Sequence, residues 1–116
     1  MKKHILCIGD SNTHGYCADP NDCADHGIRF NEDERWTCRL QKALGEDYLV
    51  TEEGLSGRTT VFTDPINENM AVLPYVYALL KSHEYIDLLI IMLGTNDSKQ
   101  RMNTTPFVVG KGMERL

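Results

Sequence analysis

The feature that most constrains the fold is an unbroken apolar run, Leu88-Leu89-Ile90-Ile91-Met92-Leu93. The run is far too short to span a membrane. It is typical of a strand buried on both faces of a parallel sheet. It stops at Gly94-Thr95-Asn96-Asp97, a cluster of turn-forming residues. In an open α/β sheet, ligands and chemistry lie at the carboxyl ends of the strands, so this loop is a candidate site.

Two earlier segments, His4–Ile8 and Tyr48–Glu53, have the same character of a strand that ends at a glycine-containing loop. Helices are predicted between and after the strands, near Glu34–Leu44, from Pro74 onward and from Thr104 onward, from the spacing of apolar residues and the positions of Pro and Gly. Strand, loop and helix therefore alternate three times. This order predicts an α/β fold, with a parallel sheet lying between helices and right-handed crossovers.

Length and charge exclude several classes of protein. A chain of 116 residues forms one domain at most. Its net charge is −5, and no cluster of Lys or Arg marks a surface for nucleic acid. The basic start, Met1-Lys2-Lys3, precedes an apolar run too short for a signal peptide. A cytoplasmic location is expected, with no membrane partner.

Four cysteines raise the question of a disulfide or a metal site. Cys7 falls inside the first predicted strand, where it is expected to be a small buried apolar residue. Cys17 and Cys23 flank a polar loop without CxxC spacing, and no pair of histidines stands beside them or Cys38 at zinc-finger spacing. Free thiols are the favoured interpretation, with a disulfide or a metal as the alternatives. No cofactor is implied.

Ser11 is the candidate nucleophile, because it follows the first strand in the turn Gly9-Asp10-Ser11. Acyl transfer to a serine needs a hydroxyl, hydrogen-bond donors for the developing oxyanion, and a base. Ser11 offers the hydroxyl and its own N–H. Gly54 offers an unobstructed backbone N–H, and Asn96 offers a side-chain amide. Since the three strands are predicted to be parallel, their loops are expected at one edge of the sheet.

The same residues carry a resemblance to a known family. Gly9-Asp10-Ser11-Asn12-Thr13, Glu53-Gly54-Leu55-Ser56-Gly57-Arg58-Thr59 and Gly94-Thr95-Asn96-Asp97 resemble the first three signature blocks of the SGNH (GDSL-type) hydrolases. Within that family they are most similar to the arylesterase and acyltransferase branch. The resemblance implies a flavodoxin-like three-layer α/β/α fold, here truncated to about three strands. It also implies a serine esterase or acyltransferase that acts on small carboxylic esters through an acyl-enzyme.

The resemblance assigns roles to individual residues. Ser11 would be the nucleophile, and Gly54 N–H and Asn96 Nδ2 would complete the oxyanion hole with Ser11 N–H. Asp10 would brace the serine loop without acting in the chemistry. The family's fourth signature, an Asp-x-x-His that supplies the base, does not occur after Asn96. Residues 1–116 are therefore expected to form the N-terminal part of a single hydrolase domain and to be inactive alone.

None of the four histidines is identified as a replacement base. His14 could share a helical face with Ser11 if a helix begins there, and His26 lies in a polar loop of unknown course. His4 and His83 are expected at the surface, away from the loops. The location of the catalytic His and Asp is thus outside this chain in the favoured interpretation.

Two other interpretations remain open at this stage. A flavodoxin-like binding module could use Ser11, Asn12 and Thr13 to hold a phosphate or nucleotide at a strand-to-helix turn. That module lacks a Walker pattern, and it leaves Gly54 and Asn96 without a role. A homo-oligomer is also possible, because an uncovered third strand is prone to pair with another chain.

Overall fold

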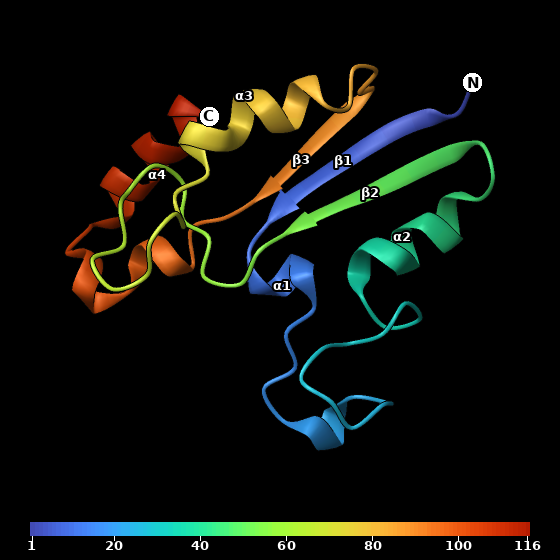
Figure 1. Ribbon diagram of the computed structural model, residues 1–116, viewed down its shortest axis with the longest axis horizontal. Coiled ribbons are helices and arrows are strands. Elements are labelled where there is room, and N and C mark those ends of the chain that lie inside the picture. The colour runs from blue at the N-terminus through green and yellow to red at the C-terminus, as the bar shows by residue number, and fades with distance from the viewer. The chain divides into compact units, whose positions relative to one another are not determined.

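The computed structural model describes residues 1–116 (Figure 1). These residues form two compact units. The first unit consists of Met1–Ser56 and Tyr85–Met92, and it contains the whole sheet. The second unit consists of Gly57–Glu84 and Leu93–Leu116. None of the helices is both long enough and apolar enough to cross a membrane.

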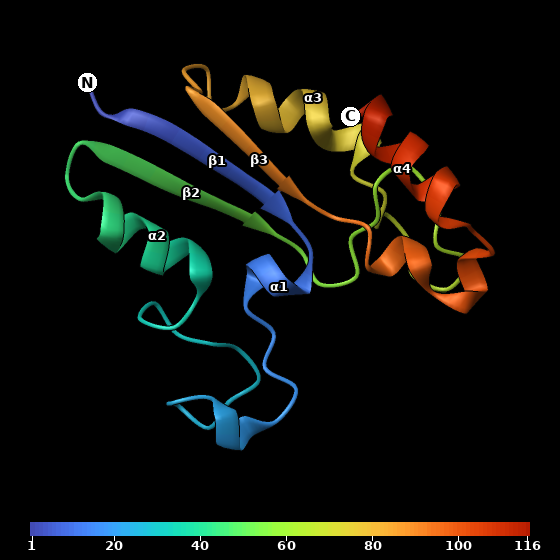
Figure 2. The ribbon, with the colours of Figure 1, turned by 180° about the vertical axis from the view of Figure 1, so that it is seen from behind.

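The sheet of the first unit has three parallel strands, as the sequence predicts. They are β1 (Lys3–Gly9), β2 (Tyr48–Gly54) and β3 (Leu88–Met92), in the order β2-β1-β3 (Figure 2). Because β1 has a neighbour on each side, it forms the core of the unit, and Ile5 to Ile8 are at most 6% exposed. The predicted α/β class, with a flavodoxin-like parallel sheet, is confirmed.

The register aligns the carboxyl ends of the three strands. Gly9 lies opposite Gly54 of β2 and opposite Met92 of β3. The N–H of Leu55 donates to Gly9 O at 3.1 Å and extends this alignment by one residue. Ser11 follows Gly9 by two residues, so the candidate nucleophile lies at the edge of the sheet where all three strands end.

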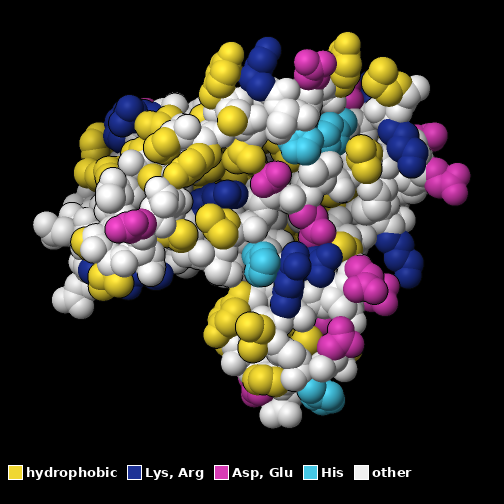
Figure 3. Space-filling model, in the orientation of Figure 1, with side chains coloured by type: hydrophobic (Ala, Val, Ile, Leu, Met, Phe, Trp, Pro, Cys, Tyr) yellow, Lys and Arg dark blue, Asp and Glu magenta, His cyan; other side chains and the backbone are white.

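The third strand differs from its prediction in burial and length. It ends at Met92 rather than Leu93, and Leu88 and Met92 are 51% and 41% exposed. The strand was expected to be buried on both faces, but it lies at the edge of this sheet and has one strand neighbour only. An apolar run indicates side chains suited to burial, but it does not show which neighbours cover them. In this sheet part of β3 is exposed to solvent. Exposed hydrophobic side chains are visible over this face of the molecule (Figure 3).

The helices of the first unit are α1 (Ser11–His14), the 3₁₀ turn η1 (Pro20–Asp22) and α2 (Trp36–Leu44). The helix α2 is joined to β2 by the side chain of Gln41, which donates to Tyr48 O at 2.8 Å and accepts from Val50 N–H at 2.7 Å. The predicted start at Glu34 is two residues too early. Arg35 has φ −59° and ψ 139°, which are not helical angles, so the helix begins at Trp36.

The second unit contains α3 (Leu73–Lys81), two 3₁₀ turns, η2 (Asn96–Ser98) and η3 (Gln100–Met102), and α4 (Pro106–Arg115). Its long irregular segment is held by an ion pair in which Arg101 Nη2 lies 2.7 Å from Asp64 Oδ2. The hydrogen bonds from Arg101 hold the pKa of the Asp64 carboxyl well below its usual range. Two backbone N–H groups, those of Ile66 and Asn67, bind the same carboxylate.

All four cysteines are free thiols. Cys7 is fully buried in β1, and Cys17 and Cys23 are each 2% exposed. Burial, with a smaller contribution from the charge of Glu52, raises the pKa of Cys7 to about 11. The thiol is therefore protonated at neutral pH and behaves as the apolar core residue that the sequence predicts.

Gly54 lies directly against the backbone of α1. A Cβ placed on Gly54 would come within 2.3 Å of His14 N and 2.7 Å of His14 Cα. The neighbouring atoms belong to backbone rather than to a flexible side chain, so α1 or the end of β2 would have to move. Gly54 thus lacks a side chain because two backbones meet there.

We expect Gly54→Ala to lower the free energy of unfolding by about 1–3 kcal/mol, the usual cost of overpacking a tightly packed site. Urea unfolding of the 116-residue chain measures this. Gly27→Ala is the matched control, because a Cβ at Gly27 would meet no atom within 4 Å. Equal midpoints for the two variants would contradict the close contact between β2 and α1.

Candidate active site

Ser11 is the first residue of α1, and local hydrogen bonds fix this short helix at both ends. At the start, the buried carboxylate of Asp10 accepts from Asn12 N–H at 2.9 Å, which is the usual capping interaction. At the end, Gly15 adopts φ +96° and its N–H donates to Ser11 O at 2.8 Å. Asp10 therefore braces the serine loop, as the sequence predicts.

The groups of Ser11 that matter for acyl transfer are not used in the fold. As the first helical residue, Ser11 has an N–H without a partner inside the helix. Its side chain is half-buried, and its hydroxyl has no hydrogen bond to any other residue. Both groups are thus available to a ligand.

Gly54 ends the strand next to Ser11. In a parallel pair, only every second residue of a strand bonds to a given neighbour. Since Leu55 N–H bonds to Gly9 O, the N–H of Gly54 is directed away from β1. The strand β2 is an edge of the sheet, so no further strand accepts from Gly54 on that side. The first unit therefore brings Ser11 and Gly54 to one edge and leaves a backbone donor on each.

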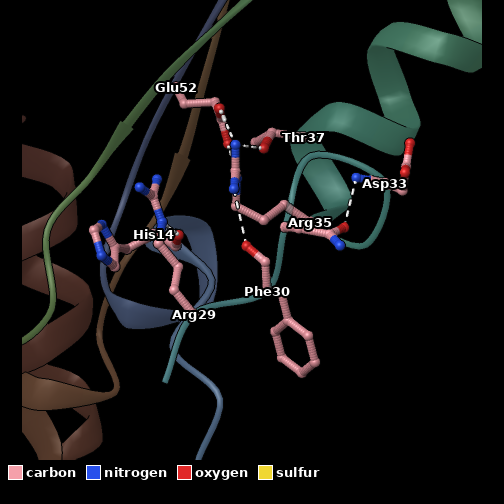
Figure 4. Close-up of polar contacts among 8 residues, drawn as sticks. His14, Arg29, Phe30, Asp33, Arg35, Thr37 and Glu52 are labelled. Carbon is pink, nitrogen blue, oxygen red and sulfur yellow. Dashed lines mark hydrogen bonds and ion pairs between the residues drawn. The ribbon is translucent and has the colours of Figure 1, made fainter. Parts of the chain in front are cut away.

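A cluster of polar and charged side chains joins the start of α2 to β2 (Figure 4). Arg35 Nε donates to Glu52 Oε2 at 2.8 Å and Arg35 Nη2 donates to Glu52 Oε1 at 3.2 Å, so the ion pair is bidentate. Thr37 Oγ1 donates to the same carboxylate at 2.5 Å. Partial burial acts to raise the pKa of Glu52, but the hydrogen bonds from Arg35 and Thr37 outweigh it and hold the pKa below its usual range.

His14 ends α1 beside Arg29, and the two side chains lie next to each other in Figure 4. Arg29 Nε donates to the carbonyl oxygen of His14 at 2.8 Å, and Tyr16 forms an isolated antiparallel bridge with Arg29. The polar loop that follows α1 is tied back to it in this way. The ring of His14 makes no hydrogen bond to the Ser11 hydroxyl, although a helix does begin at Ser11.

His4 is held at the end of β1 that lies away from the Ser11 loop. His4 lies near the start of β1, where its Nε2 contacts Thr51 Oγ1 at 2.7 Å and its Nδ1 contacts Tyr85 O at 3.1 Å. Ser11 follows the opposite end of the same strand. No group of three or more His, Cys, Asp or Glu side chains is arranged to hold a metal ion.

Asn96 belongs to the second unit, where it is 6% exposed at the start of η2. Its Nδ2 donates to Arg58 O at 3.1 Å. A side-chain amide nitrogen carries two hydrogens, so one remains for another acceptor. The contact to Arg58 fixes the direction of the amide.

Asp97 is a structural residue that the sequence reasoning did not assign. Its fully buried carboxylate accepts from Thr60 N–H, at 3.1 and 3.0 Å to its two oxygens, and from Thr60 Oγ1 at 2.6 Å. Thr104 Oγ1 donates to the backbone oxygen of Asp97. The second and third motif blocks are therefore joined by Asp97 and Thr60 as well as by Asn96 and Arg58.

Comparison with known proteins gives a family match over nearly the whole chain. The sequence profile of the GDSL-like Lipase/Acylhydrolase family matches residues 7–116. An acetylxylan esterase of Xylanibacter ruminicola is 31% identical over 98 residues, which are 82% of this chain and 17% of that protein.

Solved structures give the same result. The native aryl esterase of M. smegmatis has a TM-score of 0.86 and 43% identity over 97% of this chain and 51% of its own. Est24, a carbohydrate acetylesterase from Sinorhizobium meliloti, has a TM-score of 0.90 and 38% identity over 99% of this chain and 53% of its own. The chain therefore spans about half the length of the solved structures it matches.

The depressed pKa of Glu52 predicts a dependence of stability on pH. A carboxyl whose pKa is lower in the folded chain stabilises the fold above its unfolded pKa of about 4.3, and this stabilisation is lost as pH falls through the folded pKa. We expect Glu52→Gln to be less stable than the native chain at neutral pH and to lose less stability on acidification. Thermal unfolding between about pH 6 and pH 3 measures both slopes. The exposed Glu46→Gln is the control, and a native-like slope in Glu52→Gln would contradict the prediction.

Proposed function

Because this chain belongs to the GDSL-like lipase/acylhydrolase family, we propose that it carries the nucleophile and oxyanion donors of a serine ester hydrolase or acyltransferase. The observation that carries this proposal is the state of Ser11. A capped four-residue helix holds it at the carboxyl edge of a parallel sheet, with its hydroxyl and N–H unused. A serine that only closed a turn would have its hydroxyl bonded to nearby backbone.

In the proposed reaction, Ser11 Oγ attacks the carbonyl carbon of a small carboxylic ester. The carbonyl oxygen becomes an oxyanion that accepts hydrogen bonds from Ser11 N–H, Gly54 N–H and Asn96 Nδ2. The alcohol leaves with a proton, and the acyl group stays on Ser11 as an ester. Water or another alcohol then attacks this acyl-enzyme and releases the acid or the new ester, restoring the hydroxyl.

The second motif block contains another glycine that is a candidate backbone donor. Gly57 adopts φ +90°, a conformation that favours glycine, and its N–H belongs to the same motif block as Gly54. The absence of a side chain at Gly54 is already explained by its contact with α1. Gly57 has no such backbone contact, because the nearest atom to a Cβ there would be Met70 Sδ at 3.1 Å. We propose the Gly57 N–H as the alternative to the Gly54 N–H for the oxyanion donor of this motif block.

The base is the part of the machinery that residues 1–116 do not supply. We assign residues 1–116 to the N-terminal part of a single hydrolase domain, since the solved relatives are about twice as long. The family resemblance implies an Asp-x-x-His as the source of the base. The relatives described as acetylxylan esterase and carbohydrate acetylesterase favour a short acyl group such as acetyl on the ester. A phosphate-binding role for the Ser11 loop finds no support in these relatives.

We expect Ser11→Ala to abolish hydrolysis of p-nitrophenyl acetate by the natural gene product that contains residues 1–116. Loss of a triad nucleophile costs several orders of magnitude in turnover. Stopped assays with purified protein of verified mass measure the rate. Ser56→Ala is the control, since that serine lies in the second motif block but outside the proposed machinery. Undiminished hydrolysis by Ser11→Ala would refute the proposal.

The polypeptide that ends at Leu116 is expected to hydrolyse the same ester only slightly faster than buffer. Without a base, the serine keeps only the contribution of the oxyanion donors and of substrate binding. The comparison uses equal concentrations of folded 116-residue chain and of the natural gene product. Rapid turnover by the shorter polypeptide that disappears in Ser11→Ala would identify a base within the chain, with His14 the first histidine to replace.

A further inference from the structure

We propose that Arg35 is a positioning residue for Ser11, because its guanidinium and its stem together hold the end of α1 against β2. The inference rests on the proposed role of Ser11 as nucleophile. It concerns the contacts that fix the orientation of α1, the helix that carries the serine.

The stem of Arg35 supports the residue that ends α1. A Cβ added to Gly15 would lie 2.7 Å from Arg35 Cδ and 2.8 Å from Arg35 Cγ, so the stem passes directly over the glycine. Gly15 is buried, and its N–H donates to Ser11 O. A shift of the Arg35 stem would therefore disturb Gly15 and one of the two hydrogen bonds that Ser11 O accepts, the other being from Tyr16 N–H at 2.9 Å.

The guanidinium closes a ring of contacts around the same glycine. Arg35 Nη1 donates to Phe30 O at 2.9 Å, and Phe30 N–H donates to Gly15 O at 2.7 Å. The chain from Gly15 to Phe30 is thus held at its two ends by one arginine. Figure 4 shows Arg35 between Phe30 and the Glu52 carboxylate.

The other end of the ion pair is anchored in the sheet. Glu52 lies on β2, two residues before Gly54, and its carboxylate is also bound by Thr37 of α2. Arg35 therefore links α1 to the strand on which α1 packs. This bidentate contact adds to the direct packing of α1 on the end of β2, where Gly54 lies against the backbone of His14.

Stability alone is a weak reason for such a pair at this place. Arg35 and Glu52 have side chains only 13% and 28% exposed, and removing two charges from water costs much of what their attraction returns. An apolar pair of similar volume would stabilise the contact as well. A guanidinium fork differs in that it fixes both distance and angle. A lysine keeps the charge and most of the stem but loses the fork.

The test is steady-state hydrolysis of p-nitrophenyl acetate by the natural gene product, comparing Arg35→Lys with the native protein. We expect kcat to fall about 10- to 100-fold with KM changed less than about threefold, as for a misplaced nucleophile in a folded site. Arg39→Ala is the matched control, since Arg39 is an exposed arginine on the same helix. Circular dichroism keeps the comparison at a temperature where all variants are folded.

A kcat for Arg35→Lys equal to that of Arg39→Ala would overturn the inference. A fall in kcat that equals the fraction of Arg35→Lys protein that is unfolded would also overturn it. If Ser11→Ala proves as active as the native protein, the proposed function fails, and positioning is read from amide hydrogen exchange instead. Faster exchange at Gly15 and Phe30 in Arg35→Lys, with β1 amides unchanged, would then support the positioning role, and unchanged exchange would overturn it.

Discussion

The structure depends on the pairing of β1 with a strand on each side. Because Gly9 is aligned with both Gly54 and Met92, the end of β1 is also the end of its neighbours. The chain must turn there, and the turn carries Ser11. Hydrogen bonds in the middle of a sheet are among the last to open in a folded protein. The candidate nucleophile is thus attached to the most rigid element of the first unit.

Close contacts between α1 and the ends of β1 and β2 fix the position of the helix that carries Ser11. A Cβ at Gly9 would come within 2.0 Å of Thr13 Oγ1, and one at Gly54 within 2.3 Å of His14 N. The short helix α1 therefore packs on two strand ends that both lack side chains. A helix of four residues has little stability of its own. These contacts and the Asp10 cap stabilise α1, which is too short to be stable by itself.

Much of the fold could be predicted because its signals are local. The three strands follow from segments that end at glycine-containing loops, two of them apolar, and α2 and α4 follow from apolar spacing and from Gly45 and Pro106. The exposure of β3 could not be predicted in this way. Its composition is that of a strand with neighbours on every side, and composition does not say which neighbours are present.

The candidate site could be predicted only where its parts lie next to strand ends. Ser11, Gly54 and Asn96 could be named from motif spacing, but their hydrogen-bond partners could not. The Arg35–Glu52 pair joins residues 17 positions apart, and the Thr60–Asp97 contact joins residues 37 apart. Charged and hydroxyl residues are common in loops, and nothing in a single sequence says which of them will meet. Which of these residues are in contact is known only from the structure, because the arrangement of the strands sets the distances between them.

The chemistry of the site and the support of the site are consequently carried by different residue types. The proposed role of Ser11 requires an unused hydroxyl, and a free hydroxyl is held in place by its backbone alone. That backbone is fixed through Gly15, which has no side chain of its own to anchor it. A long side chain from elsewhere has to reach over the glycine, and Arg35 does so while its charge is neutralised by Glu52. The Ser11 hydroxyl can remain without a hydrogen bond because the residues around it, Asp10, Gly15 and Arg35, form the contacts that fix its backbone.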